Sequence, residues 1–129
     1  MKKVFRTDQA PAPIGPYSQA ASAGNLLFVS GQIALVPSTG ELMLNNIREE
    51  TLQVMNNLQS VLNEAGTDFE NIVKTSIFLS DMAHFQVVNE VYAGFFKKDF
   101  PARETVAVAG LPRGVNVEIS VIAILPDGN

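Results

Sequence analysis

The sequence predicts an α+β protein in which two helices pack on one face of a six-stranded mixed sheet. Segments with strand-like and helix-like patterns occur in the order three strands, helix, strand, helix and two strands. The length of 129 residues suits one domain that spans residues 1–129. The last predicted strand has one fully apolar side, which the helices should cover, and one half-apolar side.

The N-terminal third is expected to form three strands around one ordered loop. A short strand is predicted at residues 4–6, and the three prolines of residues 10–16 exclude a helix there. Two β-compatible runs, residues 18–23 and 26–30, flank Gly24-Asn25, a pair that tolerates positive φ. These two runs are therefore predicted to form a hairpin.

Helical spacing predicts the first helix over residues 47–65. Asn46 and Glu49 suit a capping box at its start, and Gly66 suits its C-terminal end. Its apolar stripe consists of Ile47, Val54, Met55, Leu58, Val61, Leu62 and Ala65.

A strand rich in β-branched residues is predicted at 72–79, before a second helix that Asp81 caps and that runs to about Phe96. The inward stripe of this helix is expected to be Phe85, Val88, Tyr92 and Phe95.

The last two strands are predicted at residues 103–108 and 115–125. A loop that holds Gly110, Pro112 and Gly114 joins them. The apolar side of the last strand is Val115, Val117, Ile119, Val121 and Ala123; the other side is Asn116, Glu118, Ser120, Ile122 and Ile124. A half-apolar second face favours contact with another subunit.

Composition excludes several classes of partner. A net charge of −4, a pI near 4.8 and scattered basic residues argue against binding to nucleic acid. Because there is no cysteine, disulfides and thiolate metal sites are excluded, and a reducing compartment is favoured. No signal-peptide core and no apolar run of the ~18 residues that a membrane helix needs are found, so we expect a soluble, cytoplasmic protein.

The sequence also lacks the motifs of most enzyme classes. There is one histidine, and there is no dinucleotide-binding glycine motif, no phosphate-binding Walker loop and no paired zinc histidines. His84 is expected to be a solvent-facing helix residue rather than a catalytic one.

An arginine and a glutamate on the last two strands are the best candidates for chemistry. If these strands form an antiparallel hairpin, Thr105 lies opposite Glu118 and Arg103 lies opposite Ser120, with all four on one face. The guanidinium of Arg103 could then hold a small carboxylic acid, while Glu118 handles a water molecule. From the spacing alone, a plain ion pair between Arg103 and Glu118 is the favoured interpretation.

The chain resembles the RidA (YjgF) family of enamine/imine deaminases over nearly its whole length. The resemblance rests on residues 12–20 (APIGPYSQA), 28–33 (FVSGQI) and the second helix with Asn89 and Tyr92. Its most specific part is Phe100-Pro101-Ala102-Arg103, followed by Val106, Leu111-Pro112 and Val117-Glu118-Ile119.

The resemblance implies a chorismate-mutase-like fold, a homotrimer and clefts between subunits. It implies hydrolysis of 2-aminoacrylate and related 2-imino acids to 2-oxo acids and ammonia, with no cofactor and no metal. In this chain Arg103 would bind the substrate carboxylate, Glu118 would activate water and the backbone of Thr105 would contact the ligand. The remaining pocket residues would be Tyr17, Ser30, Gly31, Asn89 and Pro112.

Two positions differ from the family pattern. Thr105 stands where many members have cysteine, which excludes a thiol-dependent reaction but not hydrolysis. Glu104 replaces a small or apolar residue and should face away from Arg103, where it can pair with a surface cation.

The sequence is also compared with two other functions. The first is a trimer that binds 2-oxo acids or similar carboxylates without turnover, which would need Arg103 but not Glu118. The second is cleavage of RNA or inhibition of translation, which fits poorly with the acidic charge and the single histidine.

Overall fold

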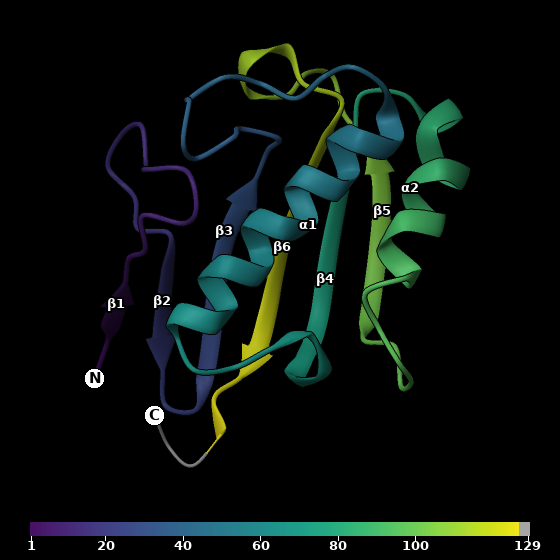
Figure 1. Ribbon diagram of the computed structural model, residues 1–129. Helices are drawn as coiled ribbons and strands as arrows, with labels where there is room; N and C mark the ends of the chain where they lie inside the picture. The colour runs from purple at the N-terminus through teal and green to yellow at the C-terminus, as the bar shows by residue number, and fades with distance from the viewer. Residues whose placement is uncertain (127–129) are drawn as a thin grey trace.

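The structure, a computed structural model, describes residues 1–126 as one mixed sheet with two α-helices on a single face (Figure 1). The six strands lie in the order β1-β2-β3-β6-β4-β5, which confirms the predicted α+β fold. The strands are β1 (Lys3–Phe5), β2 (Ala20–Ala23), β3 (Leu26–Gln32), β4 (Ile72–Leu79), β5 (Ala102–Ala107) and β6 (Val117–Ile124).

The predicted N-terminal hairpin is confirmed, and its second strand carries a bulge. β2 pairs with β3 in antiparallel register, and Gly24 takes a φ of +60° in the turn between them. β3 then pairs with β6, and the register shifts between Val29 and Gln32. This bulge places Ser30 and Gly31 outside the regular ladder, as bulges beside binding sites commonly do.

The first helix, α1 (Ile47–Glu64), forms where the apolar spacing predicts it. The Asn46 side chain accepts a hydrogen bond from the backbone N–H of Glu49 at 2.8 Å, and the Glu49 carboxylate accepts one from Asn46 Nδ2 at 3.1 Å. Gly66, just past the helix, has a φ of +84°. Both predicted end signals are therefore used.

The second helix is shorter than predicted. Asp81 caps a 3₁₀ turn (Met82–His84), and the α-helix α2 spans only Phe85–Ala93. The chain then turns toward β5, and the ring of Phe96 packs 5.7 Å from that of Phe69. These aromatic contacts are long-range, so helical spacing alone did not reveal the stop at Ala93.

The predicted hairpin between the last two strands is wrong. β4 lies between β5 and β6, and it pairs in parallel with β5 and antiparallel with β6. The helix α2 connects β4 to β5, and such a crossover is what a parallel neighbour requires. Consecutive strands at the end of the chain are therefore not neighbours in the sheet.

This topology also overturns the predicted shared face. Thr105 aligns with Ile77 and Ile119, on the face covered by the helices. Glu118 aligns with Phe78 and Val106, one residue along, and so points to the opposite face. Arg103 and Glu118 consequently lie on opposite faces of the sheet within one chain, and they cannot form the predicted ion pair.

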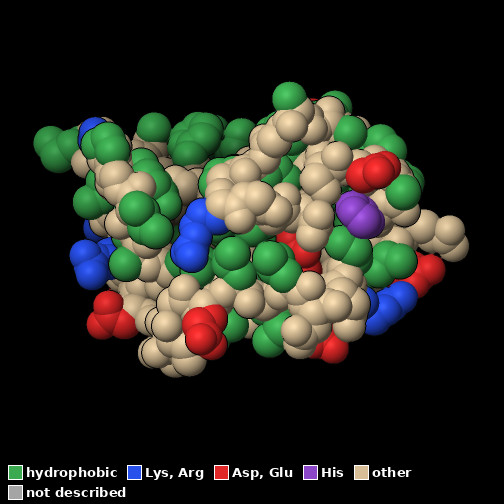
Figure 2. Space-filling model, turned by 90° about the horizontal axis from the view of Figure 1, so that it is seen from above, with side chains coloured by type: hydrophobic (Ala, Val, Ile, Leu, Met, Phe, Trp, Pro, Cys, Tyr) green, Lys and Arg blue, Asp and Glu red, His purple; other side chains and the backbone are tan. Residues whose placement is uncertain are grey.

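The core fills the space between the helices and one face of the sheet. It includes the predicted apolar side of β6, and the inward residues of α1 reach zero exposure at Val54, Met55, Leu58 and Leu62. The other face is partly bare, with exposed apolar side chains at Val4, Leu26, Phe28, Val106 and Ile124. Within residues 1–126, neither helix is long and apolar enough to cross a membrane. From above, charged side chains of both signs are scattered over the surface (Figure 2).

Candidate functional site

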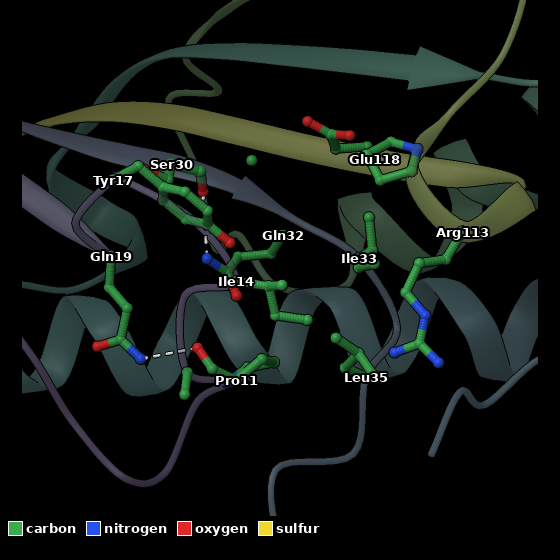
Figure 3. Close-up of a pocket in the computed structure, with 13 residues that line it drawn as sticks. Pro11, Ile14, Tyr17, Gln19, Ser30, Gln32, Ile33, Leu35, Arg113 and Glu118 are labelled. Carbon is green, nitrogen blue, oxygen red and sulfur yellow. Dashed lines mark hydrogen bonds between the residues drawn. The ribbon is translucent and has the colours of Figure 1, made fainter. Parts of the chain in front are cut away.

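A cavity of about 500 Å³ lies beside the end of β3 and the turn before β6. Five predicted site residues line it together: Tyr17, Ser30, Gly31, Pro112 and Glu118. The rest of its wall is mainly apolar and includes Ile14, Ile33 and Leu35 (Figure 3). A mainly apolar wall with a few polar groups is typical of small-molecule sites.

A buried amide holds the proline-rich loop against this cavity. Gln19 is only 1% exposed, and its Nε2 donates to the carbonyls of Thr7 at 3.0 Å and Pro11 at 2.9 Å (Figure 3). Its Oε1 accepts from the backbone N–H of Thr7 at 2.7 Å. Proline has no N–H to donate to a neighbouring strand, so this loop cannot form regular structure. The Gln19 side chain instead makes the hydrogen bonds that the backbone N–H and C=O groups of the loop need.

Ser30 and Gly31 form the floor of the cavity at the β3 bulge. The Ser30 hydroxyl donates to the carbonyl of Ser18 at 2.6 Å, which fixes its orientation. A Cβ added at Gly31 would overlap Oε2 of Glu118 and lie 2.8 Å from its Cδ. Glycine at this position therefore leaves the space that the Glu118 carboxylate fills.

Glu118 is the acidic group of the cavity. Within residues 1–126 its carboxylate has no hydrogen-bond or ion-pair partner, and burial raises its pKa above the usual value. Arg103 lies on the opposite face of the sheet and does not pair with this carboxylate within the single chain. A half-buried carboxyl with a raised pKa is suited to exchange a proton with a bound water or substrate.

Arg103 belongs to a second cluster, on the helix-covered side of β5. Its Nη1 donates to Oδ1 of Asn89 at 2.6 Å. Its guanidinium carbon lies 5.2 Å from the ring centre of Tyr92 and 5.7 Å from that of Phe85. The amide and the two rings hold the guanidinium without neutralising it, since none of them is an anion. It remains able to bind a carboxylate.

The two positions that differ from the family pattern both belong to β5. Thr105 lies on the same face as Arg103, and its buried Oγ1 has no hydrogen-bond partner within residues 1–126. Glu104 points the other way and pairs with Lys74 at 3.1 Å, as predicted from alternation. It also accepts from the Ser76 hydroxyl at 2.6 Å, and this bond, followed by Lys74, lowers the pKa of Glu104.

The described part of the chain offers no metal site, because residues 1–126 contain no group of three potential acidic, histidine or cysteine ligands. His84 lies at the start of α2 and does not line the cavity. The two groups placed for chemistry are the Glu118 carboxyl beside the cavity and the Arg103 guanidinium, which Asn89 and Tyr92 hold on the other face of the sheet.

Sequence reasoning missed three residues of these clusters as site candidates. Phe85 and Tyr92 were assigned to the inward helix stripe, although their rings also support Arg103. Arg113 also lines the Glu118 cavity. The signal for Arg113 was its place between Pro112 and Gly114, where a turn presents the side chain to solvent.

Together the fold and the two clusters define a small α+β protein with a carboxyl-bearing cavity and a separate, preorganised arginine. The family model described as Endoribonuclease L-PSP matches residues 7–125. The chain therefore belongs to this family, the one that includes the RidA (YjgF) proteins, as the sequence motifs predict.

Individual relatives agree with this assignment. A mouse protein named 2-iminobutanoate/2-iminopropanoate deaminase is 47% identical, with 96% of this chain and 92% of the mouse protein covered. The structure of the Rid-family protein YyfA from Yersinia pestis is similar at a TM-score of 0.95 and 48% identity, covering 97% of this chain and all of that one. That of E. coli TdcF with bound serine has a TM-score of 0.90 at 36% identity, covering 95% and 98%.

Proposed function

We propose that this protein is a hydrolytic deaminase that converts 2-aminoacrylate and related 2-imino acids to 2-oxo acids and ammonia. The observation that carries the proposal is the Glu118 carboxyl, which has no partner within residues 1–126 and lies in a cavity large enough for such acids, in a chain whose relatives include named 2-iminobutanoate/2-iminopropanoate deaminases. The activity in the names of those relatives is the one proposed for this chain.

The chemistry asks little of the protein beyond orientation and one proton acceptor. 2-Aminoacrylate takes a proton at its terminal carbon to become the iminium of pyruvate. Water then adds to the C=N carbon while Glu118 accepts one water proton, and Glu118 gives that proton to nitrogen. As the C–N bond breaks and ammonia leaves with the electron pair, Glu118 accepts the remaining hydroxyl proton, and the 2-oxo acid forms. Release of this proton to solvent replaces the one taken up by the enamine carbon, so atoms and charge balance. Because burial raises the pKa of Glu118, the carboxyl is suited both to accept and to return the proton.

We further propose that Arg103 binds the substrate carboxylate and that the complete site forms between subunits of a homotrimer. Arg103 and Glu118 lie on opposite faces of one chain's sheet, so a single substrate could meet both only where two chains come together. Asn89 holds the guanidinium, and the backbone of Thr105 would contact the ligand. The partly bare sheet face, with Phe28 and Val106 exposed, is the expected contact surface.

The test of activity is a coupled assay. A pyridoxal-phosphate-dependent dehydratase generates 2-aminoacrylate from serine, and the appearance of pyruvate is followed with and without this protein. The wild-type protein should accelerate pyruvate formation, and both Arg103→Ala and Glu118→Gln should abolish the acceleration while the oligomer stays intact. Acceleration by Arg103→Ala at the wild-type rate would contradict the proposal.

Mixing the two inactive variants tests whether the site is shared. If subunits are unfolded, mixed in equal amounts and refolded, about a quarter of the sites in a randomly assembled cyclic oligomer pair an intact Arg103 with an intact Glu118. Activity should therefore return to about a quarter of the wild-type level in the mixture. A mixture that stays inactive would place both groups within one chain and overturn the shared site.

The binding-only alternative is decided by Glu118→Gln. A protein that merely holds small carboxylates would bind 2-oxobutanoate equally with or without this substitution, and the wild type would show no turnover. RNA cleavage is not supported, despite the name of the family model, because the net charge is −4 and the basic side chains form no stripe on the face shown in Figure 2.

A further inference from the structure

We infer that Arg113 gives the Glu118 cavity a preference for ligands with a second acidic group, so that 2-imino dicarboxylates bind better than 2-imino monocarboxylates. This inference rests on the proposed function, since it assigns a substrate class to the same site. The preference concerns the part of the cavity that lies near Arg113, away from the Glu118 carboxylate, where the side chain of the ligand would lie.

Arg113 is presented to the cavity by a tight turn. It lies at the centre of the 3₁₀ turn Pro112–Gly114, with a φ of 58°, a left-handed conformation that is unfavourable for a residue with a Cβ. Backbone bonds from Gly114 to Leu111 at 3.1 Å and from Val115 to Pro112 at 3.3 Å close the turn. The turn therefore fixes the point from which this side chain leaves the backbone.

The guanidinium of Arg113 is free to bind an anion. Within residues 1–126 it makes no hydrogen bond and no ion pair, whereas Arg48 pairs with Glu90 at 2.6 Å and Arg103 bonds to Asn89. Among residues 1–126, Arg113 is also the sole lysine or arginine that lines the cavity. An unpaired guanidinium is a strong donor to a carboxylate because it can make two parallel hydrogen bonds.

The two charged groups of the cavity lie apart, with an apolar wall near them. In Figure 3 the Arg113 guanidinium extends toward Leu35, while the Glu118 carboxylate points away from the Arg113 guanidinium. Ile14, Ile33 and Leu35 supply apolar surface in the same cavity. A ligand whose imino carbon lies at Glu118 could therefore extend its carbon chain along this wall and present a terminal carboxylate to Arg113.

The size of the cavity agrees with a ligand longer than 2-aminoacrylate. At about 500 Å³ it falls in the range of sites that enclose drug-sized molecules, whereas 2-aminoacrylate is a three-carbon acid. A monocarboxylate leaves Arg113 without a partner, while a dicarboxylate gives it one. The preference for dicarboxylates therefore follows both from the charge of Arg113 and from the volume of the cavity.

Calorimetric titration with two stable product-like ligands tests this preference. 2-Oxoglutarate carries the second carboxylate and 2-oxobutanoate does not. The wild-type protein should bind 2-oxoglutarate about tenfold more tightly than 2-oxobutanoate, the difference expected from one additional charge-assisted contact. Arg113→Gln, which replaces the guanidinium by a shorter, uncharged polar side chain, should remove this ratio through weaker binding of 2-oxoglutarate.

Two matched variants complete the experiment. Arg113→Lys keeps the positive charge and should retain most of the ratio, and Lys98→Gln removes a charge from an exposed loop outside this cavity and should leave the ratio unchanged. The inference is overturned if the wild type shows no preference, or if Arg113→Gln weakens both ligands equally or neither. Hydrolysis of 2-aminoacrylate by the wild type is measured separately, so a failure of the proposed function is distinguished from a failure of this preference.

Discussion

The Glu118 carboxylate lies directly beside Gly31 at the β3 bulge, in the space that a Cβ at residue 31 would overlap. The contact is with the end of a flexible side chain, so the carboxylate can move aside without disturbing the backbone. The glycine therefore determines where the carboxyl group lies, and it is dispensable for the fold.

Gly31→Ala should accordingly reduce turnover and leave stability nearly unchanged. We expect kcat to fall by about tenfold to a hundredfold, because a displacement of about 1 Å is enough to misalign a reacting group. Turnover in the coupled assay and the thermal midpoint are the two measurements. Gly110→Ala is the control, since a Cβ at Gly110 meets nothing within 4 Å. Full activity in Gly31→Ala would show that the observed carboxylate position is not required.

Asn89→Asp tests whether Arg103 binds the substrate carboxylate. The present amide accepts the Arg103 hydrogen bond at 2.6 Å without adding charge, whereas an aspartate would form an ion pair and compete with the substrate. We expect KM to rise about tenfold or more, with a smaller rise for Asn89→Ala, which removes only the orienting bond.

Gln86→Glu is the matched control for that substitution, because it adds the same negative charge on the exposed side of α2. Its KM should stay at the wild-type value. If Asn89→Asp also keeps the wild-type KM, the carboxylate is bound elsewhere, and Arg113 becomes the candidate.

The pH dependence of stability provides a third prediction. Burial raises the pKa of Glu118 in the folded chain above its value of 4.5 in the unfolded chain. At a pH between the unfolded pKa and the folded pKa, the folded chain therefore binds more protons than the unfolded chain. The stabilising effect of the raised pKa is present below pH 4.5 and is lost as pH rises through the folded value. Glu118→Gln should therefore increase the free energy of unfolding at pH 7.

This increase should disappear when the pH falls below 4.5, where the carboxyl is protonated in both states. Denaturant titrations at several pH values measure it. The comparison is made in an Arg103→Ala background, so that a guanidinium from a second copy cannot offset the desolvation of Glu118. A substitution that destabilises the protein equally at every pH would contradict the assigned cause of the shift.

Local structure followed from the sequence because local rules control it. The strand at 72–79 and the helix α1 are found where residue type, spacing and capping predict them. The prediction that Val117 and Ile119 face the core is also confirmed, since alternation along one strand does not depend on its neighbours.

Strand pairing could not be read from the same signals. Alternation within β5 and β6 is compatible both with a direct hairpin and with an intervening strand, and only the second case occurs. The pattern strand, helix, strand over residues 72–107 contained the information, because a crossover helix joins parallel neighbours. Five predicted cavity residues did come together, since loops near the β3 bulge and the start of β6 meet at one end of the sheet.

The start of β6 is anchored by a buried carboxylate. Glu50 on α1 has no exposed surface, and its Oε2 accepts from the backbone N–H groups of both Asn116, at 2.8 Å, and Val117, at 3.0 Å. Its other oxygen accepts from Asn116 Nδ2 at 2.9 Å. Removing the carboxylate would leave buried donors without acceptors, and this is among the larger single-residue penalties in proteins.

Glu50→Ala should therefore destabilise the protein by about 3 kcal/mol. Glu50→Gln should cost less, because its one oxygen can accept from both backbone groups while the Asn116 amide turns to accept from the new Nε2. Glu64→Ala, at the exposed end of α1, should change stability by no more than about 0.5 kcal/mol. Chemical denaturation of the three variants measures these differences. A Glu50→Ala protein as stable as Glu64→Ala would show that α1 does not hold the strand that carries Glu118.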